Sequence, residues 1–145
     1  MKTVNQFING KEHISKSERF GDVFNPANGE ITKKVSFANN DDVKLAIDCA
    51  VEAGKKWAAT PPLTRSRVFF RFKDLILRDM DKLALELTSE HGKILSDSAG
   101  SITRGMEVVE FACGIPHLLK GEYSENVGTD IDSWSMRQPL GVSVG

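Results

Sequence analysis

The sequence has few cysteines, no excess of either charge and no long apolar run, and each absence excludes a class of protein. Two cysteines in 145 residues are too few for a disulfide-stapled secreted domain, which favours a reducing compartment. A net charge of -1, without a basic stripe, does not suit a nucleic-acid or membrane partner. No segment reaches membrane-spanning length, and MKTVNQFING lacks the apolar core of a signal peptide. We expect a cytoplasmic protein, or a mitochondrial-matrix protein if the source is eukaryotic.

Motifs for cofactors, metals and nucleophiles are also missing. No G-x-G-x-x-G pattern occurs, so no NAD contact is assigned to this chain. His13, His91 and His117 have no companions at metal-ligand spacing. Cys49 and Cys113 lie in apolar helical segments without a nearby base, so we expect core thiols and not nucleophiles. The sequence therefore assigns no catalytic, cofactor-binding or metal-binding residue.

Short strands joined by turns are predicted at the start of the chain. Asn9-Gly10, between apolar residues and Lys11, is the strongest short pattern for a hairpin turn. A second turn is predicted over residues 25–29, where Pro26 presets one backbone angle and Gly29 tolerates a positive φ. An extended segment is expected to follow from Ile31.

A helix is predicted next, from an N-cap at Asn39 or Asn40 to the Pro61-Pro62 pair. Asp41 and Asp42 fall in its first turn, where negative charge favours the helix dipole. One apolar stripe at helical spacing contains Val43, Ala46, Ile47, Ala50, Val51 and Trp57. Such a stripe has to be covered by another element.

Two more helical segments are predicted downstream. Thr64 is the expected N-cap of the first, with Leu63 and Val68 placed as a hydrophobic staple. Its stripe continues past a bend near Asp79 to a stop at Gly92. The last helical stretch, expected to kink or end near Pro116, carries Ile102, Met106, Val109 and Cys113 at four- and three-residue steps.

The chain after Glu122 changes toward a two-residue period. Trp134 and Met136 are expected on one strand face and Ile131 on the other, which predicts a bulge near residues 132–133 or a loop. The uncharged run of residues 139–145 is typical of a strand buried on both faces. Because no neighbouring strands follow, we expect this chain to be the N-terminal piece of a larger protein.

Several motifs together resemble the aldehyde dehydrogenase family. They are FINGK at residues 7–11, DVFNPANGE at 22–30, RSRVFFRFKDLI at 65–76, EHGK at 90–93 and QPLGVSVG at 138–145. ATPPLTRSRVFFRFK at 59–73 and the long segment 103–142, which includes FACGIPHLLKGEYSENV, resemble its CoA-acylating methylmalonate-semialdehyde dehydrogenases. The resemblance covers nearly the whole chain.

The resemblance implies an α/β fold, with this chain as the N-terminal portion of an aldehyde dehydrogenase-like fold. Residues 1–121 would be strands and helices of the nucleotide-binding domain, and residues 122–138 part of the oligomerisation flap. Residues 139–145 would form a truncated first strand of the nucleotide-binding sheet. Self-association through the flap around Trp134 and Met136 is expected, in a homo-oligomer.

The resemblance also implies a reaction. These enzymes oxidise methylmalonate or malonate semialdehyde with NAD and pass the acyl group to coenzyme A, yielding propionyl-CoA or acetyl-CoA. Arg104 matches the family's arginine for the substrate carboxylate, and a guanidinium suits a carboxylate. Phe111 is expected to line the same tunnel. The family's nucleophilic cysteine, general base and cofactor loop lie beyond the position of Gly145, so this chain alone is expected to be inactive and prone to aggregation.

Other interpretations remain open at this stage. Without the resemblance, Arg104 would be a solvated arginine paired with Glu107 or Glu110. With the resemblance, two other classes stay open. One is a non-catalytic truncated remnant that only packs with partner subunits, and the other is part of an aldehyde dehydrogenase of other substrate preference.

Overall fold

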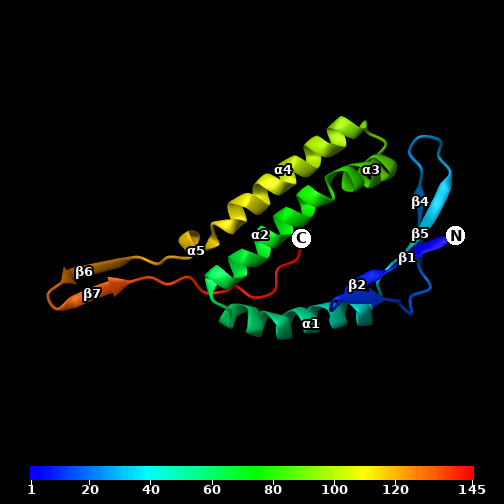
Figure 1. The fold of residues 1–145 in the computed structure, drawn as a ribbon. Coiled ribbons are helices and arrows are strands. Elements are labelled where there is room, and N and C mark those ends of the chain that lie inside the picture. The colour runs from blue at the N-terminus through cyan, green and yellow to red at the C-terminus, as the bar shows by residue number, and fades with distance from the viewer.

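The computed structural model describes residues 1–145 and shows a mixed α/β chain with strands at both ends and helices between them (Figure 1). The strands are β1 (Lys2–Val4), β2 (Gln6–Ile8), β3 (Lys11–His13), β4 (Phe20–Phe24), β5 (Ile31–Ser36), β6 (Tyr123–Gly128) and β7 (Ile131–Trp134). The helices are α1 (Asn40–Ala59), α2 (Pro62–Arg78), α3 (Met80–His91), α4 (Leu95–Cys113) and α5 (Ile115–Leu118). This order of strands, helices and strands is the predicted one.

The two predicted N-terminal turns are confirmed. Asn9 and Gly10, at φ 53° and 75°, join β2 and β3 into an antiparallel hairpin. Gly29, at φ 77°, closes the second turn, in which the Asn25 amide donates to the Glu30 carbonyl at 2.8 Å. That turn joins β4 to β5, and β1 lies parallel on the other edge of β5. Local turn chemistry therefore sets the topology of this end of the molecule.

The predicted cap of α1 is confirmed at Asn39. Its side-chain oxygen accepts from the Asp42 amide at 2.9 Å, and the Asp42 carboxylate accepts from the Asn39 amide at 2.9 Å. This reciprocal pair satisfies two amides that a helix terminus leaves without partners. The helix ends at Ala59, before the two prolines.

The predicted start of α2 is wrong. The helix begins at Pro62, with Pro61 as N-cap, so Thr64 and Leu63 lie inside its first turn and form neither a cap nor a staple with Val68. Proline suits the first helical position because its missing amide would have no partner there. The Pro61 carbonyl accepts from the Thr64 amide at 2.9 Å, which closes the turn without a side-chain cap.

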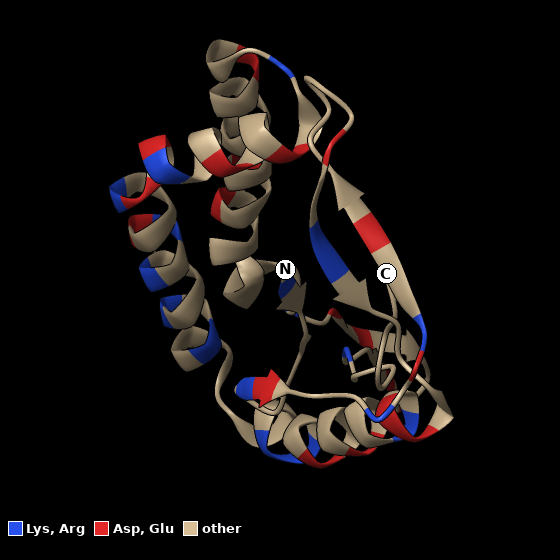
Figure 2. Ribbon diagram, turned by 90° about the vertical axis from the view of Figure 1, so that its right-hand side faces the viewer, with Lys and Arg blue, Asp and Glu red and all other residues tan.

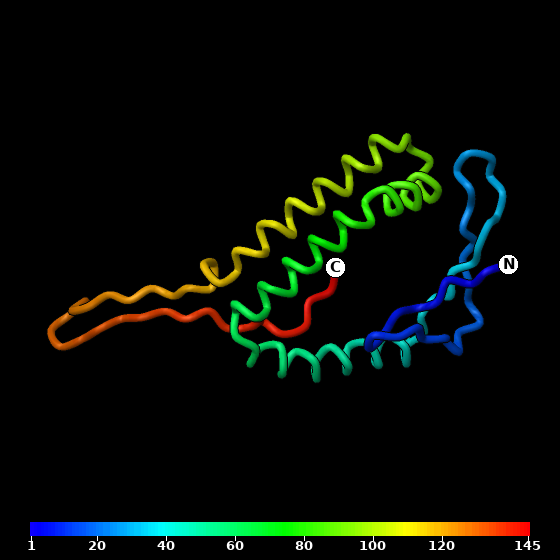
Figure 3. Tube along the Cα trace, in the orientation of Figure 1, coloured from blue at the N-terminus to red at the C-terminus, as the bar shows by residue number.

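The later helix boundaries are confirmed. Asp79 separates α2 from α3, Gly92 ends α3 at φ 83°, and α4 ends at Cys113 before the short α5 that contains Pro116. α2 and α4 lie side by side, and α3 packs against α4 (Figure 1). α1 lies apart from this helical layer, and its first turns pack on β2 (Figure 3).

Small residues form the contacts of the helical layer. Ser66 of α2, Ala84 of α3 and Ser98 of α4 are 1%, 2% and 0% exposed. The Ser66 hydroxyl donates to the Cys113 carbonyl at 2.6 Å, and the Thr88 and Ser98 hydroxyls lie 2.8 Å apart. Small side chains let the helix axes approach, and their hydroxyls are satisfied across the contact.

Large apolar residues, in contrast, stay exposed. Ala84 is the only apolar residue among five buried ones, and the accessible surface is 11304 Å². A compact monomer of 16.0 kDa would expose about 7,400 Å². Cys49 and Cys113, expected in a core, are only part-buried, because α1 and the outer faces of the helical layer have no covering element within this chain.

The helices carry charged residues of both signs, with basic residues predominating on α2 (Figure 2). The α1 face includes the ion pair of Lys44 with Asp48, at 2.5 Å, and that of Lys55 with Glu52, at 2.6 Å. No helix of the structure is both long enough and apolar enough to cross a membrane.

The hairpin of β6 and β7 projects away from the helices (Figures 1 and 3). Its irregularity was predicted near residues 132–133 but lies in the opposite strand. Residues 125–127 of β6 lie opposite the single residue Asp132 of β7, which makes a bulge in β6, and Asn126 has φ 53°. The Asp132 carboxylate accepts from the Asn126 amide at 2.9 Å, which holds the bulge in place. Met136 lies beyond the end of β7, so it does not share a strand face with Trp134.

Residues 135–145 return from the hairpin toward α1 without regular secondary structure (Figure 3). The predicted strand over 139–145 has no partner to pair with here and is not formed. Leu140 and Val144 are 103% and 90% exposed. A strand requires hydrogen-bonding neighbours, so an apolar run alone does not make one.

Candidate functional site

Arg104 and Phe111 lie on the solvent face of α4. They are seven residues apart and therefore nearly in line along the helix, with Val108 between them. Phe111 and Val108 are 69% and 68% exposed. A different face of α4 packs against α3, where Ser98 contacts Thr88. The structure thus brings both predicted site residues onto one uncovered face, where a cation adjoins an apolar surface.

Arg104 takes part in no ion pair within this chain. Its Nη2 atom donates to the Ser101 hydroxyl at 3.0 Å. Neither alternative partner considered from the sequence is used, since Glu110 instead binds Lys73 of α2 at 2.6 Å. That hydrogen bond and the charge of Glu110 raise the pKa of Lys73. The Arg104 guanidinium therefore keeps donors available for an external carboxylate.

Two glycines flank this arginine in different ways. A β-carbon on Gly100 would lie 3.7 Å from Nη1 of Arg104, so Gly100 is the glycine beside the guanidinium. Gly105, the residue after Arg104, has no atom near its would-be β-carbon. The guanidinium points back along the helix toward its N-terminus, as helical side chains do.

Lys93, which was not predicted from the sequence, also lies beside this face of α4. Its Nζ atom donates to the same Ser101 hydroxyl at 2.6 Å. Lys93 follows the left-handed Gly92 that ends α3, so the turn between the two helices brings it alongside α4. The EHGK motif contained this residue, but no local pattern connected it to Ser101 eight positions later.

A second polar cluster joins β3 to the start of α1. Asp42, 5% exposed, accepts from Ser15 and lies 2.7 Å from Nε2 of His13. The hydrogen bond from Ser15, followed by those from the Asn39 amide and His13, lowers the pKa of Asp42 to about 2. The cluster contains a serine, an aspartate and a histidine, but the serine donates to the aspartate. No base acts on the hydroxyl, so the cluster is structural.

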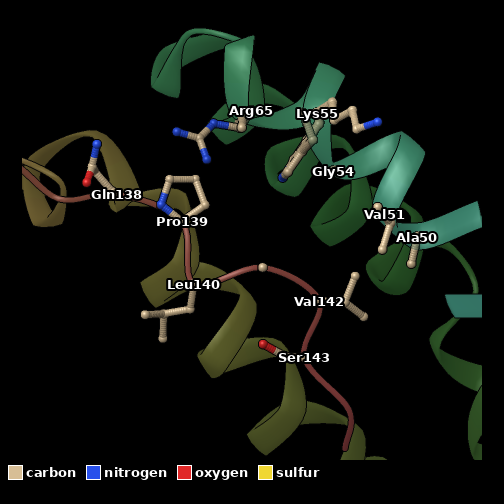
Figure 4. A pocket seen from close by; sticks show the side chains of 13 residues that line it. Ala50, Val51, Gly54, Lys55, Arg65, Gln138, Pro139, Leu140, Val142 and Ser143 are labelled. Atoms are coloured by element: carbon tan, nitrogen blue, oxygen red, sulfur yellow. The ribbon is translucent and has the colours of Figure 1, made fainter. Parts of the chain in front are cut away.

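An open groove of about 710 Å³ lies between α1 and residues 138–143 (Figure 4). Val51, Trp57 and Leu140 contribute apolar surface, and Arg65 lies at one side. The Nε atom of Arg65 is buried and has no hydrogen-bond partner. Arg104 and Phe111 do not line this groove, so it is separate from the α4 face.

The aldehyde dehydrogenase family profile matches residues 13–145. The chain is 46% identical over its full length to a malonate-semialdehyde dehydrogenase of Pseudomonas aeruginosa, of which it covers 29%. It is also 46% identical over 142 residues, 98% of the chain, to the acylating, mitochondrial methylmalonate-semialdehyde dehydrogenase of Arabidopsis thaliana, of which it covers 23%.

Solved structures give the same result. A methylmalonate-semialdehyde dehydrogenase of Oceanimonas doudoroffii superposes with a TM-score of 0.92 at 48% identity, over 97% of this chain and 28% of the other. A Sinorhizobium meliloti structure described as the same kind of enzyme, complexed with NAD, gives 0.94 at 45% identity, over 97% and 29%. The chain spans less than a third of the length of these relatives. In sequence and in fold, the chain belongs to the aldehyde dehydrogenase family.

Proposed function

We propose that this chain is the N-terminal part of an NAD-dependent, CoA-acylating dehydrogenase. The enzyme converts methylmalonate semialdehyde to propionyl-CoA, or malonate semialdehyde to acetyl-CoA. The similarity to such enzymes over the full length of the chain supports the reaction class. The observation that carries the substrate class is the unpaired, exposed Arg104 on α4.

Arg104 would bind the acid end of the substrate. A semialdehyde acid differs from a simple aldehyde by a carboxylate, and a guanidinium fork binds a carboxylate through two parallel hydrogen bonds. Because no acidic side chain of this chain forms an ion pair with the Arg104 guanidinium, no ion pair has to be broken before the substrate binds. Phe111 lies about two helical turns further along the same face. It would supply apolar surface beside the carbon chain of the substrate.

NAD and coenzyme A belong to the complete enzyme in this proposal. NAD supplies the hydride acceptor and coenzyme A the thiol that receives the acyl group. No residue of this chain is assigned to hold either group, since none of its clusters offers a nucleotide cradle. The role of the chain is to bind and orient the carboxylate while its helices pack on the nucleotide-binding domain.

The uncovered apolar surface supports that packing role. The whole chain exposes far more surface than a compact monomer of this mass does, and large apolar residues of α1 and α2 are among those exposed. We place residues 1–121 against the nucleotide-binding sheet and residues 139–145 as its first strand, where neighbouring strands would pair with them. Residues 122–138 would form the flap that contacts another subunit, with the 65% exposed Trp134 as its main apolar contact.

The substrate assignment is tested with Arg104→Leu in the natural protein that contains this chain. We expect kcat/KM for malonate semialdehyde to fall about 100-fold, because a charged hydrogen-bonded pair is lost. For propanal, the neutral aldehyde of the same length, it should change less than about threefold. Arg71→Leu, at an exposed arginine of α2, is the matched control and should alter neither. Equal losses on both aldehydes would remove Arg104 from the substrate site.

A packing-only role makes a different prediction. If the chain is a remnant, the natural protein will form no NADH from semialdehyde, NAD and coenzyme A at any concentration. The 145-residue chain by itself should be inactive under the dehydrogenase proposal too, so this assay requires the natural protein, with its intact mass recorded. Protein-dependent NADH formation by the natural protein excludes the remnant interpretation.

The flap assignment is tested by association. Trp134→Ser should weaken subunit assembly of the natural protein at least about tenfold, because a large exposed aromatic residue is lost from the contact. Analytical ultracentrifugation over a concentration series measures this change. Asp130→Asn in the hairpin turn is the control, since asparagine tolerates the φ of 59° at that position. An unchanged association constant for Trp134→Ser would contradict the assignment.

A further inference from the structure

Two cations converge on one hydroxyl on the face of α4 that carries Arg104. Lys93 Nζ donates to Ser101 Oγ at 2.6 Å, and Arg104 Nη2 donates to the same atom at 3.0 Å. Like charges repel at such separations, and proteins usually place a carboxylate between them. The arrangement is therefore unusual for two side chains with no further task.

No carboxylate of this chain neutralises the pair. Six ion pairs are formed in the structure, and neither Lys93 nor Arg104 belongs to any of them. The acidic residues on α4 lie elsewhere: Glu110 binds Lys73, and Asp97 and Glu107 bind neither cation. The cluster therefore has an uncompensated charge of about two units beside a part-buried serine.

The serine hydroxyl organises both donors. A hydroxyl oxygen has two lone pairs, and both are used here by accepting from Lys93 and Arg104. The hydroxyl hydrogen of Ser101 is then still available to donate. An ammonium, a guanidinium and a hydroxyl donor therefore lie close together. Lys93 and Ser101 are part-buried whereas Arg104 is exposed, so solvent screening is reduced at the ammonium but not at the guanidinium.

We propose that Lys93 is the second cation of the carboxylate site and that Ser101 is the positioning residue that holds Lys93 and Arg104 together. The proposal rests on the proposed function, because it concerns the same carboxylate. The substrate acid end would bind between the ammonium and the guanidinium and relieve their repulsion. Lys93 acts directly on the carboxylate, whereas Ser101 acts through the two cations.

The test uses the natural protein with Lys93→Met and Ser101→Ala, and with the conservative variants Lys93→Arg and Ser101→Thr. KM and kcat are measured for malonate semialdehyde and for propanal. Lys93→Met should raise KM for the semialdehyde about tenfold and leave kcat and both propanal constants within twofold. Ser101→Ala should raise that KM about fivefold. Arginine at 93 and threonine at 101 should restore KM to within about threefold.

Matched controls separate a local charge effect from a general loss of structure. Lys73→Met removes a lysine that pairs with the other side of α4, and Ser89→Ala removes a hydroxyl that donates to the Glu86 carbonyl. Neither should change selectivity between the two aldehydes. Calorimetric binding of malonate gives a readout that needs no turnover, and Lys93→Met should weaken it about tenfold.

The outcomes distinguish the two proposals. If Arg104→Leu loses acid selectivity but Lys93→Met and Ser101→Ala do not, the proposed function stands and this inference fails. If Arg104→Leu affects both aldehydes equally, the substrate assignment fails. Malonate binding then decides the inference by itself: unchanged binding in Lys93→Met and Ser101→Ala overturns it.

Discussion

Asp42 at the start of α1 and Asp132 in the β6–β7 hairpin make the same kinds of hydrogen bond in opposite surroundings. Each carboxylate accepts from a backbone amide at 2.9 Å, of Asn39 and Asn126 respectively. Each also accepts from a hydroxyl, of Ser15 and of Tyr123. Asp42 is buried whereas Asp132 is exposed. Water competes for the bonds of Asp132 but scarcely for those of Asp42, so burial decides how much the same chemistry stabilises.

Among the variants that test this comparison, the largest effect is expected from Asp42→Ala in the natural protein. The substitution removes the capping partner of Asn39 and leaves Ser15 and His13 without their shared acceptor. Amide exchange in the first two turns of α1 should rise about tenfold. Hydrogen-exchange mass spectrometry measures it, with Asp132→Ala as the matched control. If amide exchange rises equally around the substituted residue in both variants, burial does not explain a difference in stabilisation between Asp42 and Asp132.

Lowering the pH should also weaken the contribution of Asp42 to stability, gradually as its carboxylate is protonated. The folded pKa of Asp42 is lowered from 3.8 to about 2. A depressed pKa contributes stability that is complete above about pH 4 and is lost as the pH falls toward 2. Exchange at the α1 N-terminus should therefore accelerate over this window. Asp42→Asn should be less sensitive to pH there, because asparagine does not titrate, and an unchanged pH profile in that variant would assign the acid effect to other carboxylates.

The smallest effect is expected at Tyr123. Its hydrogen bond to Asp132, with a smaller contribution from partial desolvation, raises the pKa of the phenol above its usual value. Asp132→Asn should return that pKa toward 10 and leave the melting temperature within about 1 °C. NMR of ring-labelled tyrosine follows the titration, with Tyr123→Phe to assign the resonance. A Tyr123 pKa that stays raised in Asp132→Asn would show that the carboxylate does not set it.

Local chemistry explains which elements could be predicted from sequence. Asn9-Gly10, the Asn39 cap and the Gly92 stop each require only residues within one turn, and all three are confirmed. Thr64 failed as a cap because Pro62 provides an equally good local start two residues earlier. The bulge was placed in the wrong strand because the two-residue period does not show which partner carries the extra residues.

The residues of the candidate site also differ in whether the sequence or only the tertiary structure points to them. Arg104 and Phe111 were predicted from the sequence because the family resemblance reaches them, and the structure places both on one face of α4. Lys93 was missed because its relation to Ser101 depends on how the chain turns between α3 and α4. The His13–Asp42 contact spans 29 positions and was equally invisible. Side chains that meet across a turn leave no periodic pattern.

The sequence by itself determined the order of the elements, most of their ends and the family, since these depend on backbone propensities, caps and spacing between near neighbours. Only the tertiary structure decided which charges stay unpaired on α4, which aspartate is buried, and which apolar faces this chain leaves uncovered. Those properties depend on distances between segments that are remote along the chain, and burial sets the local dielectric that gives each contact its strength.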